Sequence, residues 1–455
     1  MKKRHVKAGT AIVLAAFLAG CSAVAPEPSA QDLGQAPDVL LAQAGMPLRW
    51  WDGFEDAALN HLLEQVLASN LDLAVAVERI REQRAQRRLA GAALFPSLGA
   101  GASAQRASGL EPASWYGADL AWEIDLFGRL RAQRDAAGAL AQATVHDYEA
   151  LRLSLMAEVA VVYLQLRLAQ RQAQLAQRTG EVLGRTSQLV EARRRMGMAN
   201  RLDAERMLAE HESTLAEIPV AQQQVTSARY ALAYLLATDV ATIDRQLELG
   251  SEQPRVPQRV AANALLAMPA ETLRWRPDVR AAERRMAAAG GELAAERAAR
   301  FPQLTLGALG GFERGVGSPG WSLSLQLLQP LFDFGAIRAR VESADARLAQ
   351  SRLAYESALR SAFRESQTSI HAYGQSMLRQ ARLDAAAAAA RTASDLARRQ
   401  YEEGMVSLLE VLDAQRSAYD IERTLSSATI DVALRWVDIY RTLGVASGMP
   451  GGQAG

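Results

Sequence analysis

Two stretches of the chain alternate regularly between apolar and polar residues. They are the predicted strands at residues 115–125 and 321–332, in which apolar residues occupy every second position from 116 to 124 and from 321 to 327. A period of two residues places the apolar side chains on one face of a β-strand. A further strand candidate precedes each stretch, at residues 97–106 and 303–312. The pattern therefore predicts two β-hairpins, each with an apolar face and a more polar face.

These hairpins have two possible interpretations. Alternation over about ten residues, with aromatic residues near the ends, is typical of a transmembrane β-strand. A half-buried strand in a soluble sheet has the same period, and it is the better interpretation of an isolated hairpin. The N-terminal sequence and the duplication described below favour membrane strands.

A long stretch without proline follows each hairpin, at residues 129–195 and 336–403. The first has apolar residues at intervals of three and four, the spacing of a coiled-coil stripe. A helix of about 67 residues is about 100 Å long, a suitable length for crossing a periplasm. The stripe consists of Tyr148, Leu151, Leu155, Val159, Val162, Leu166, Ala169 and Ala173.

Each long helix is expected to end in a turn that contains glycine, at Gly197 and at Gly404. Glycine readily adopts the left-handed conformation that stops a helix. Shorter returning helices are predicted at residues 202–236, where Pro219 is expected to cause a kink, and at residues 408–443.

The order of these elements occurs twice, which indicates a duplicated unit. The two copies are offset by about 206 to 207 residues, and a period this long is unlike the 20–50 residues of solenoid repeats. The matching segments are Phe95-Pro96-Ser97-Leu98 with Phe301-Pro302-Gln303-Leu304, Leu126-Phe127-Gly128 with Asp333-Phe334-Gly335, Tyr148-Glu149 with Tyr355-Glu356, and Gly197-Met198 with Gly404-Met405.

The N-terminus resembles a bacterial lipoprotein signal. A basic segment precedes a short apolar run, too short to span a bilayer, that ends in Leu18-Ala19-Gly20-Cys21. Cys21 is the only cysteine, so it has no partner for an internal disulfide, and lipid attachment explains its presence. Ser22 follows it, as in lipoproteins sent to the outer membrane. A plain signal peptide that happens to contain a cysteine is the alternative.

These features predict six segments. They are a signal peptide with lipobox (1–20), a lipidated tether (21–49), a first repeat (50–237), an equatorial linker (238–275), a second repeat (276–443) and a C-terminal tail (444–455). Two hairpins supply only four strands, whereas a membrane barrel needs at least eight strands and no open edge. A symmetric trimer would supply twelve.

Composition excludes several classes of protein. The net charge of +1 gives no electrostatic basis for binding nucleic acid. His211-Glu212 begins like a zinc-protease motif, but residue 215 is leucine where the second histidine is required. Asp333-Phe334-Gly335 matches a tripeptide of protein kinases, but the other kinase motifs are missing from the sequence. Five scattered histidines and a single cysteine make no metal site. We therefore expect neither an enzyme nor a cofactor.

Several motifs resemble those of the TolC-like outer-membrane efflux channels, in particular the NodT-like lipoprotein branch that serves multidrug pumps of the RND type. The similarity extends over nearly the whole mature chain. The motifs are Trp50-Trp51 with Phe54 and Asp56, Gly91 through Phe95-Pro96, residues 122–128 (WEIDLFG) and residues 276–283 (RPDVRAAE).

The resemblance implies a mainly helical homotrimer, with a 12-stranded β-barrel in the outer membrane and a 12-helix α-barrel in the periplasm. Cargo would pass unaltered from a periplasmic adaptor (membrane fusion) protein and an inner-membrane RND-type pump to the outside. The covalent lipid on Cys21 would anchor each copy to the membrane, and no other cofactor is implied.

The resemblance also assigns roles to the ends of the long helices. The adaptor would dock on Gly197, Met198 and Ala199 and on Gly404, Met405 and Val406. A gate would follow the second tip, with Leu409 as an apolar constriction, Glu410 and Asp413 as acidic rings, and Arg416 paired with acids in the closed state. The counterparts in the first tip are Leu202, Asp203 and Arg206. Each charge also fits an ordinary solvated pair on a helix.

Two rival functions remain open at this stage. A structural coiled-coil lipoprotein would have no duct, but it would not need alternating strands at matching places in both halves. An exit duct for type I polypeptide secretion would share the architecture, and the lipobox favours small-molecule efflux over it. The transported substrate cannot be identified from these residues.

Overall fold

The computed structural model describes residues 49–106, 108, 113–250, 270–313 and 319–444. Each half of the described chain contains the same five elements. In the first half these are α4 (Leu71–Ala92), β1 (Ser97–Gln105), β2 (Ala113–Ile124), α5 (Arg129–Arg195) and α6 (Arg201–Leu235). In the second half they are α9 (Pro277–Ala298), β3 (Gln303–Glu313), β4 (Gly320–Leu328), α10 (Ala336–Glu402) and α11 (Leu408–Leu443).

Four short elements lie outside this repeated set: η2 (Trp50–Phe54), α3 (Ala57–Ser69), α7 (Val240–Leu247) and η3 (Ala270–Trp275). The bounds of the long helices agree with the sequence prediction. The predicted end of the last strand at residue 332 is wrong, because β4 ends at Leu328 and Pro330 has no N–H group to continue the ladder. No helix in the described part of the chain has both the length and the apolar character needed to cross a bilayer.

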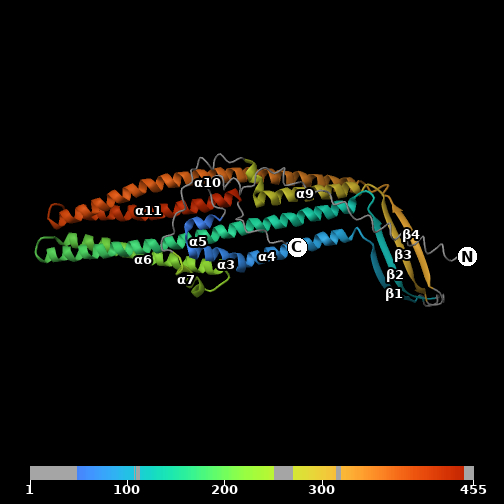
Figure 1. Cartoon of the computed structure of the whole chain (residues 1–455), viewed down its shortest axis with the longest axis horizontal. Coiled ribbons are helices and arrows are strands. Elements are labelled where there is room, and N and C mark those ends of the chain that lie inside the picture. The colour runs from blue at the N-terminus through green and yellow to red at the C-terminus, as the bar shows by residue number, and fades with distance from the viewer. Residues whose placement is uncertain (1–48, 107, 109–112, 251–269, 314–318, 445–455) are drawn as a thin grey trace.

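The four strands form one antiparallel sheet in the order β1-β2-β3-β4. The central pair, β2 with β3, joins the two halves, with Trp115 opposite Glu313 and Ile124 opposite Leu304. The sheet stands at one end of an elongated molecule, and the turns after α5 and α10 lie at the other end (Figure 1). β1 and β4 are the edges of the sheet.

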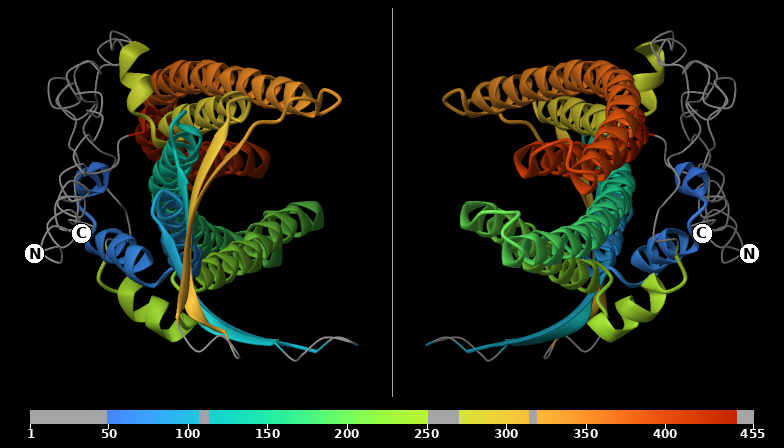
Figure 2. Two further views of the ribbon diagram at one scale, coloured as in Figure 1. Left: turned by 90° about the vertical axis from the view of Figure 1, so that its right-hand side faces the viewer. Right: turned by 90° about the vertical axis from the view of Figure 1, so that its left-hand side faces the viewer.

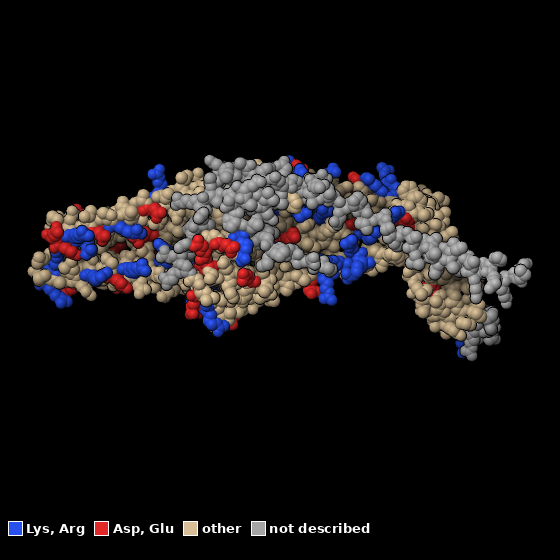
Figure 3. Space-filling model, in the orientation of Figure 1, with Lys and Arg blue, Asp and Glu red and all other residues tan. Residues whose placement is uncertain are grey.

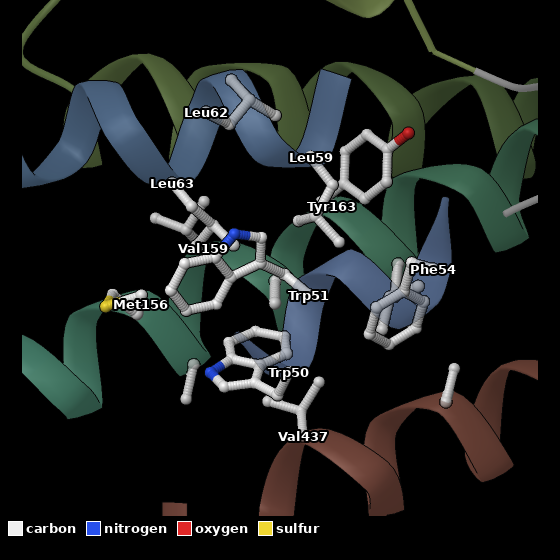
Figure 4. Packing of buried hydrophobic residues seen from close by; sticks show 14 of the residues in the cluster. Trp50, Trp51, Phe54, Leu59, Leu62, Leu63, Met156, Val159, Tyr163 and Val437 are labelled. Atoms are coloured by element: carbon white, nitrogen blue, oxygen red, sulfur yellow. The ribbon is translucent and has the colours of Figure 1, made fainter. Parts of the chain in front are cut away.

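The helices form a curved layer. α5 packs against α4, α6, α9 and α11, and α10 packs against α9 and α11. Viewed along the long axis, the long helices lie on an arc, with α3 and α7 on its convex side (Figure 2). The largest apolar core lies near the middle of the long axis, where η2 and α3 meet α5 and α11 (Figure 4). The indole of Trp436 in this core donates a hydrogen bond to the carbonyl of Trp50.

The starts of α4 and α9, the helices that lead into the sheet, lie against the ends of the returning helices α6 and α11. In the first half, Asn70 caps α4 and donates a 2.8 Å hydrogen bond to the carbonyl of Leu235 at the end of α6. In the second half, Arg276 precedes α9 and donates a 2.7 Å hydrogen bond to the carbonyl of Thr442 at the end of α11. The duplication therefore extends to these junctions, although their side chains differ.

Candidate functional site: the sheet faces and the helix tips

The register of the sheet separates its side chains into two faces of different character. Residues directly opposite one another in an antiparallel pair lie on the same face. One face is apolar or glycine except for Ser114 near the start of β2: Leu98, Ala100, Ala102, Ala104, Ser114, Tyr116, Ala118, Leu120, Trp122, Ile124, Leu304, Leu306, Ala308, Gly310, Phe312, Trp321, Leu323, Leu325 and Leu327. The other face carries mostly glycine, serine, glutamine and acids. Such a sheet suits lipid on one side and water on the other.

Aromatic side chains gather near both ends of the apolar face. Tyr116 stacks on Phe312 near the far end, with ring centroids 5.4 Å apart, and Phe127 stacks on Phe301 at the helix end, 4.7 Å apart. About eleven residues separate Tyr116 from Phe127, which corresponds to roughly 27 Å of height for a strand tilted by about 40°. This height matches the apolar band of a membrane barrel. Little charge is visible on the strand region in Figure 3, unlike the helices.

An acidic side chain precedes each long helix and caps it. Asp125 accepts hydrogen bonds from the backbone N–H groups of Leu130 and Arg131 at the start of α5. Asp333 accepts from those of Gly335 and Ile337 at the start of α10, which lowers the pKa of the Asp333 carboxyl. The aspartate of Asp333-Phe334-Gly335 thus orients a helix where it leaves the sheet.

The two helix tips have the same backbone conformation. Gly197 and Gly404 have φ angles of +74° and +80°, which strain any residue with a side chain. The N–H group of Met198 donates to the carbonyl of Arg193, and that of Met405 to the carbonyl of Gln400, each over 2.8 Å. Both methionines are exposed, at 69% and 62%, whereas Ala199 and Val406 are half-buried. Each tip therefore presents an apolar, pliable side chain on a fixed turn.

A contact between the two halves, which sequence reasoning missed, fixes the tips side by side. The guanidinium of Arg193 lies 4.5 Å from the ring centroid of Tyr401 and donates to the carbonyls of Tyr401 and Glu402 over 3.1 and 3.0 Å. Below it lies a small apolar core that joins α5, α6, α10 and α11, made of Leu183, Val190, Met207, Tyr401, Leu408, Val411 and Leu412. No local motif around Arg193 signals this contact, because its partners are more than 200 residues away.

The predicted gate segment begins α11. The exposed side chain of Leu409 points away from the tip core, to which Leu408 belongs. The Glu410 carboxylate accepts a 2.7 Å hydrogen bond from the backbone N–H of Ser407 and forms a capping box with it. Glu410 therefore has a local role at the helix start, while Asp413 is exposed one turn later.

Arg416 pairs with Glu210 of α6, which belongs to the other half of the chain. Seven residues further along, Arg423 pairs with Glu217 over 3.3 Å. The ion pair with Glu210 raises the pKa of the Arg416 guanidinium. The acid that Arg416 contacts within one chain is thus Glu210, and neither Glu410 nor Asp413 is bonded to it.

The counterpart positions in the first tip show a similar arrangement. Leu202 is exposed, like Leu409, and the side chain of Asn200 accepts a 2.8 Å hydrogen bond from the N–H of Asp203. Arg206 is exposed. Cys21, the predicted lipid site, lies outside the described residues. Among the described residues, no group of histidine, cysteine and acidic side chains is placed to hold a metal ion.

The profile of the family described as outer membrane efflux protein matches residues 62–238 and 268–445. The pyoverdine export outer membrane protein OpmQ of Pseudomonas putida is 32% identical over 438 residues, with 90% of each chain covered. Outer membrane protein OprJ of Pseudomonas aeruginosa is 32% identical and covers 87% of this chain and 86% of its own. The solved structure of the outer-membrane channel OprN has a TM-score of 0.82 at 32% identity, with 93% of this chain and 99% of that chain covered.

Proposed function

Because the chain belongs to the outer membrane efflux protein family, we propose that three copies close around one axis into a duct that spans the outer membrane and reaches into the periplasm. The protein is the outer-membrane component of an efflux system, and it conducts its cargo passively, without enzymatic chemistry. In the proposed trimer the four strands of each copy form a third of a 12-stranded barrel, and the long helices form a 12-helix α-barrel.

The open edges of the sheet carry this proposal. Within the described part of the chain, β1 and β4 each have one side without a strand partner, while one face of the sheet is apolar except for Ser114. In a bilayer, unpaired backbone N–H and C=O groups are costly, so sheets there must close. β1 of one copy pairing with β4 of the next satisfies both edges, and cyclic symmetry repeats the contact three times.

A disulfide between the two edges tests the assembly. Cysteines placed at Ser97 or Ser103 on β1, combined with Ser322 or Ser324 on β4, are expected to give a ladder of cross-linked species that stops at three copies on a denaturing gel. A matched control with both cysteines inside one chain, at Ser103 and its β2 neighbour Trp115, is expected to give only monomer. A ladder ending at two copies, or continuing beyond three, contradicts the trimer.

We further propose that the two repeats span residues 50–237 and 276–443, that Cys21 carries the lipid, and that the tips around Gly197 and Gly404 dock a periplasmic adaptor that delivers cargo from an RND-type pump. Relatives whose names refer to pyoverdine, solvents and toluene support small organic molecules as the cargo class.

A photocrosslinking residue at position 405 in living cells distinguishes the possible partners. An adaptor that accompanies a proton-driven pump supports small-molecule efflux. An adaptor of an ATP-binding-cassette exporter would instead indicate type I polypeptide secretion. Capture of no adaptor would contradict the docking role of the tip.

A further inference from the structure

The water-facing side of the sheet carries a large aromatic side chain, that of Trp115. The remaining described strand residues on this face are glycine, alanine, serine, threonine, glutamine, leucine and acids. Trp115 lies near the start of β2, at the end of the sheet away from the helices (Figure 1). In the proposed duct this position is the outer end of the lumen.

Glycines beneath the indole determine how the ring lies. Gly101, Gly117 and Gly311 face one another across β1, β2 and β3. A methyl group added at Gly117 would lie 2.6 Å from Cζ2 of Trp115, one at Gly311 would lie 2.8 Å from Nε1, and one at Gly101 would lie 3.4 Å from Cζ3. Opposite ends of the ring system thus rest on different strands. The indole lies along the sheet, with one face against the glycines and the other toward the lumen.

A carboxylate lies on the same face, in the row of residues next to Gly101, Gly117 and Gly311 and away from Trp115. The Asp119 side chain extends over β1, where a methyl group at Gly99 would lie 2.6 Å from its Oδ1 atom. Successive rows on one face of a strand are about 7 Å apart, so the carboxylate and the indole are neighbours. Within the described part of the chain Asp119 forms no ion pair, and it is exposed.

We infer that Trp115 and Asp119 form a contact site for planar aromatic cations at the outer end of the lumen. The inference rests on the proposed function, because this face lines water only in the assembled barrel. The free indole face stacks on an aromatic ring and attracts a cation, and the carboxylate supplies the opposite charge. The site thereby favours planar cationic cargo over saturated cations of the same charge.

Block of single-channel current by ethidium tests the site. The purified trimer is inserted into a planar bilayer, and ethidium is added on the side of the strands, away from the periplasmic gate acids. Trp115→Ala is expected to weaken the block about tenfold, and Asp119→Asn by a similar factor. Tetraethylammonium, which has no ring to stack, should block wild type and Trp115→Ala equally. Trp321→Ala is the matched control, since Trp321 lies near the same end of the sheet on the apolar face.

Each outcome decides the proposal. Equal ethidium block in a conducting wild-type channel and in Trp115→Ala overturns the site and leaves the duct intact. A trimer that conducts no current either as wild type or with Arg416→Ala, the change expected to open the gate, overturns the duct, and the site with it. Trp115→Leu keeps an apolar side chain over the glycines but removes the ring, so its loss of block separates stacking from any defect in assembly.

Discussion

At the residue scale, Arg416 is a charge near the tip whose partner lies in the other half of the chain. Its guanidinium joins α11 to Glu210 of α6, so the pair holds the two returning helices together. Exposed ion pairs contribute up to roughly 1 kcal/mol each, but three copies would act together in the proposed trimer. Three such pairs together could stabilise a closed state of the gate that the resemblance implies for this segment, whereas a single pair would contribute too little.

Arg416→Ala is expected to make the duct open more often. The loss of three pairs corresponds to a shift of roughly tenfold to a hundredfold in the closed–open equilibrium. Single-channel recordings measure the open probability. Arg360→Ala, which removes an exposed pair with Glu356 on α10, is the control and is expected to leave it unchanged. An Arg416→Ala channel that stays as closed as wild type would remove this residue from the gate.

At the scale of elements, the junction between α9 and α11 depends on one buried cation. Arg276 pairs with Asp278 and Glu365 over 2.8 and 2.9 Å, in addition to its bond to the carbonyl of Thr442. Burial raises the pKa of the Glu365 carboxyl, but the hydrogen bonds from Arg276 and Ser361 lower it below its usual value in the net result. This single side chain thus connects the start of α9, the end of α11 and the middle of α10.

Arg276→Ala is expected to destabilise the protein by about 2–4 kcal/mol, because Glu365 loses its cation and the Thr442 carbonyl its donor. The heat-dissociation temperature of the detergent-solubilised protein measures the loss. Arg285→Ala, at an exposed pair with Asp147, is the control and should change it little. Equal effects of both changes would contradict a special role for the junction.

The ion pair between Arg276 and Glu365 predicts that the stability of the protein depends on pH. Since the folded-state pKa of Glu365 lies below its ordinary value of 4.5, its stabilisation is complete above that pH and is lost as the pH falls through the folded-state pKa. When the pH is lowered from about 6 to about 3, the melting temperature of the wild type should therefore fall further than that of Arg276→Ala. Parallel pH profiles for the two proteins would count against the coupling.

At the scale of the whole molecule, the sequence was sufficient for the order of the elements and for most of their bounds. α5 begins after Gly128 and ends before Gly197, and both glycines have positive φ angles that stop a helix. The predicted end of β4 lies too far along the chain because Leu331 and Phe332 are apolar, although the alternation ends at Leu327 and Pro330 cannot continue the backbone ladder.

The candidate site was less predictable from sequence because its contacts join distant segments. The partners of Arg193 and Arg416 lie in the opposite half, and only the folded chain brings them together. The capping role of Glu410 has a local signature, since Ser407 precedes it by three residues, whereas the family resemblance implies a role for its charge in the gate. The position of Gly101, Gly117 and Gly311 beneath Trp115 depends on the register of three strands, and no single sequence motif specifies that register.

The unpaired edges of β1 and β4 also bear on inheritance. In a closed ring every copy supplies an edge to each neighbour, so one copy with a disrupted edge strand is enough to leave a seam open. In a cell that makes normal and edge-disrupted chains equally, random mixing leaves about one trimer in eight fully normal. A proline introduced on either edge strand should thus act as a dominant allele, whereas a mutation that prevents the chain from being made should be recessive.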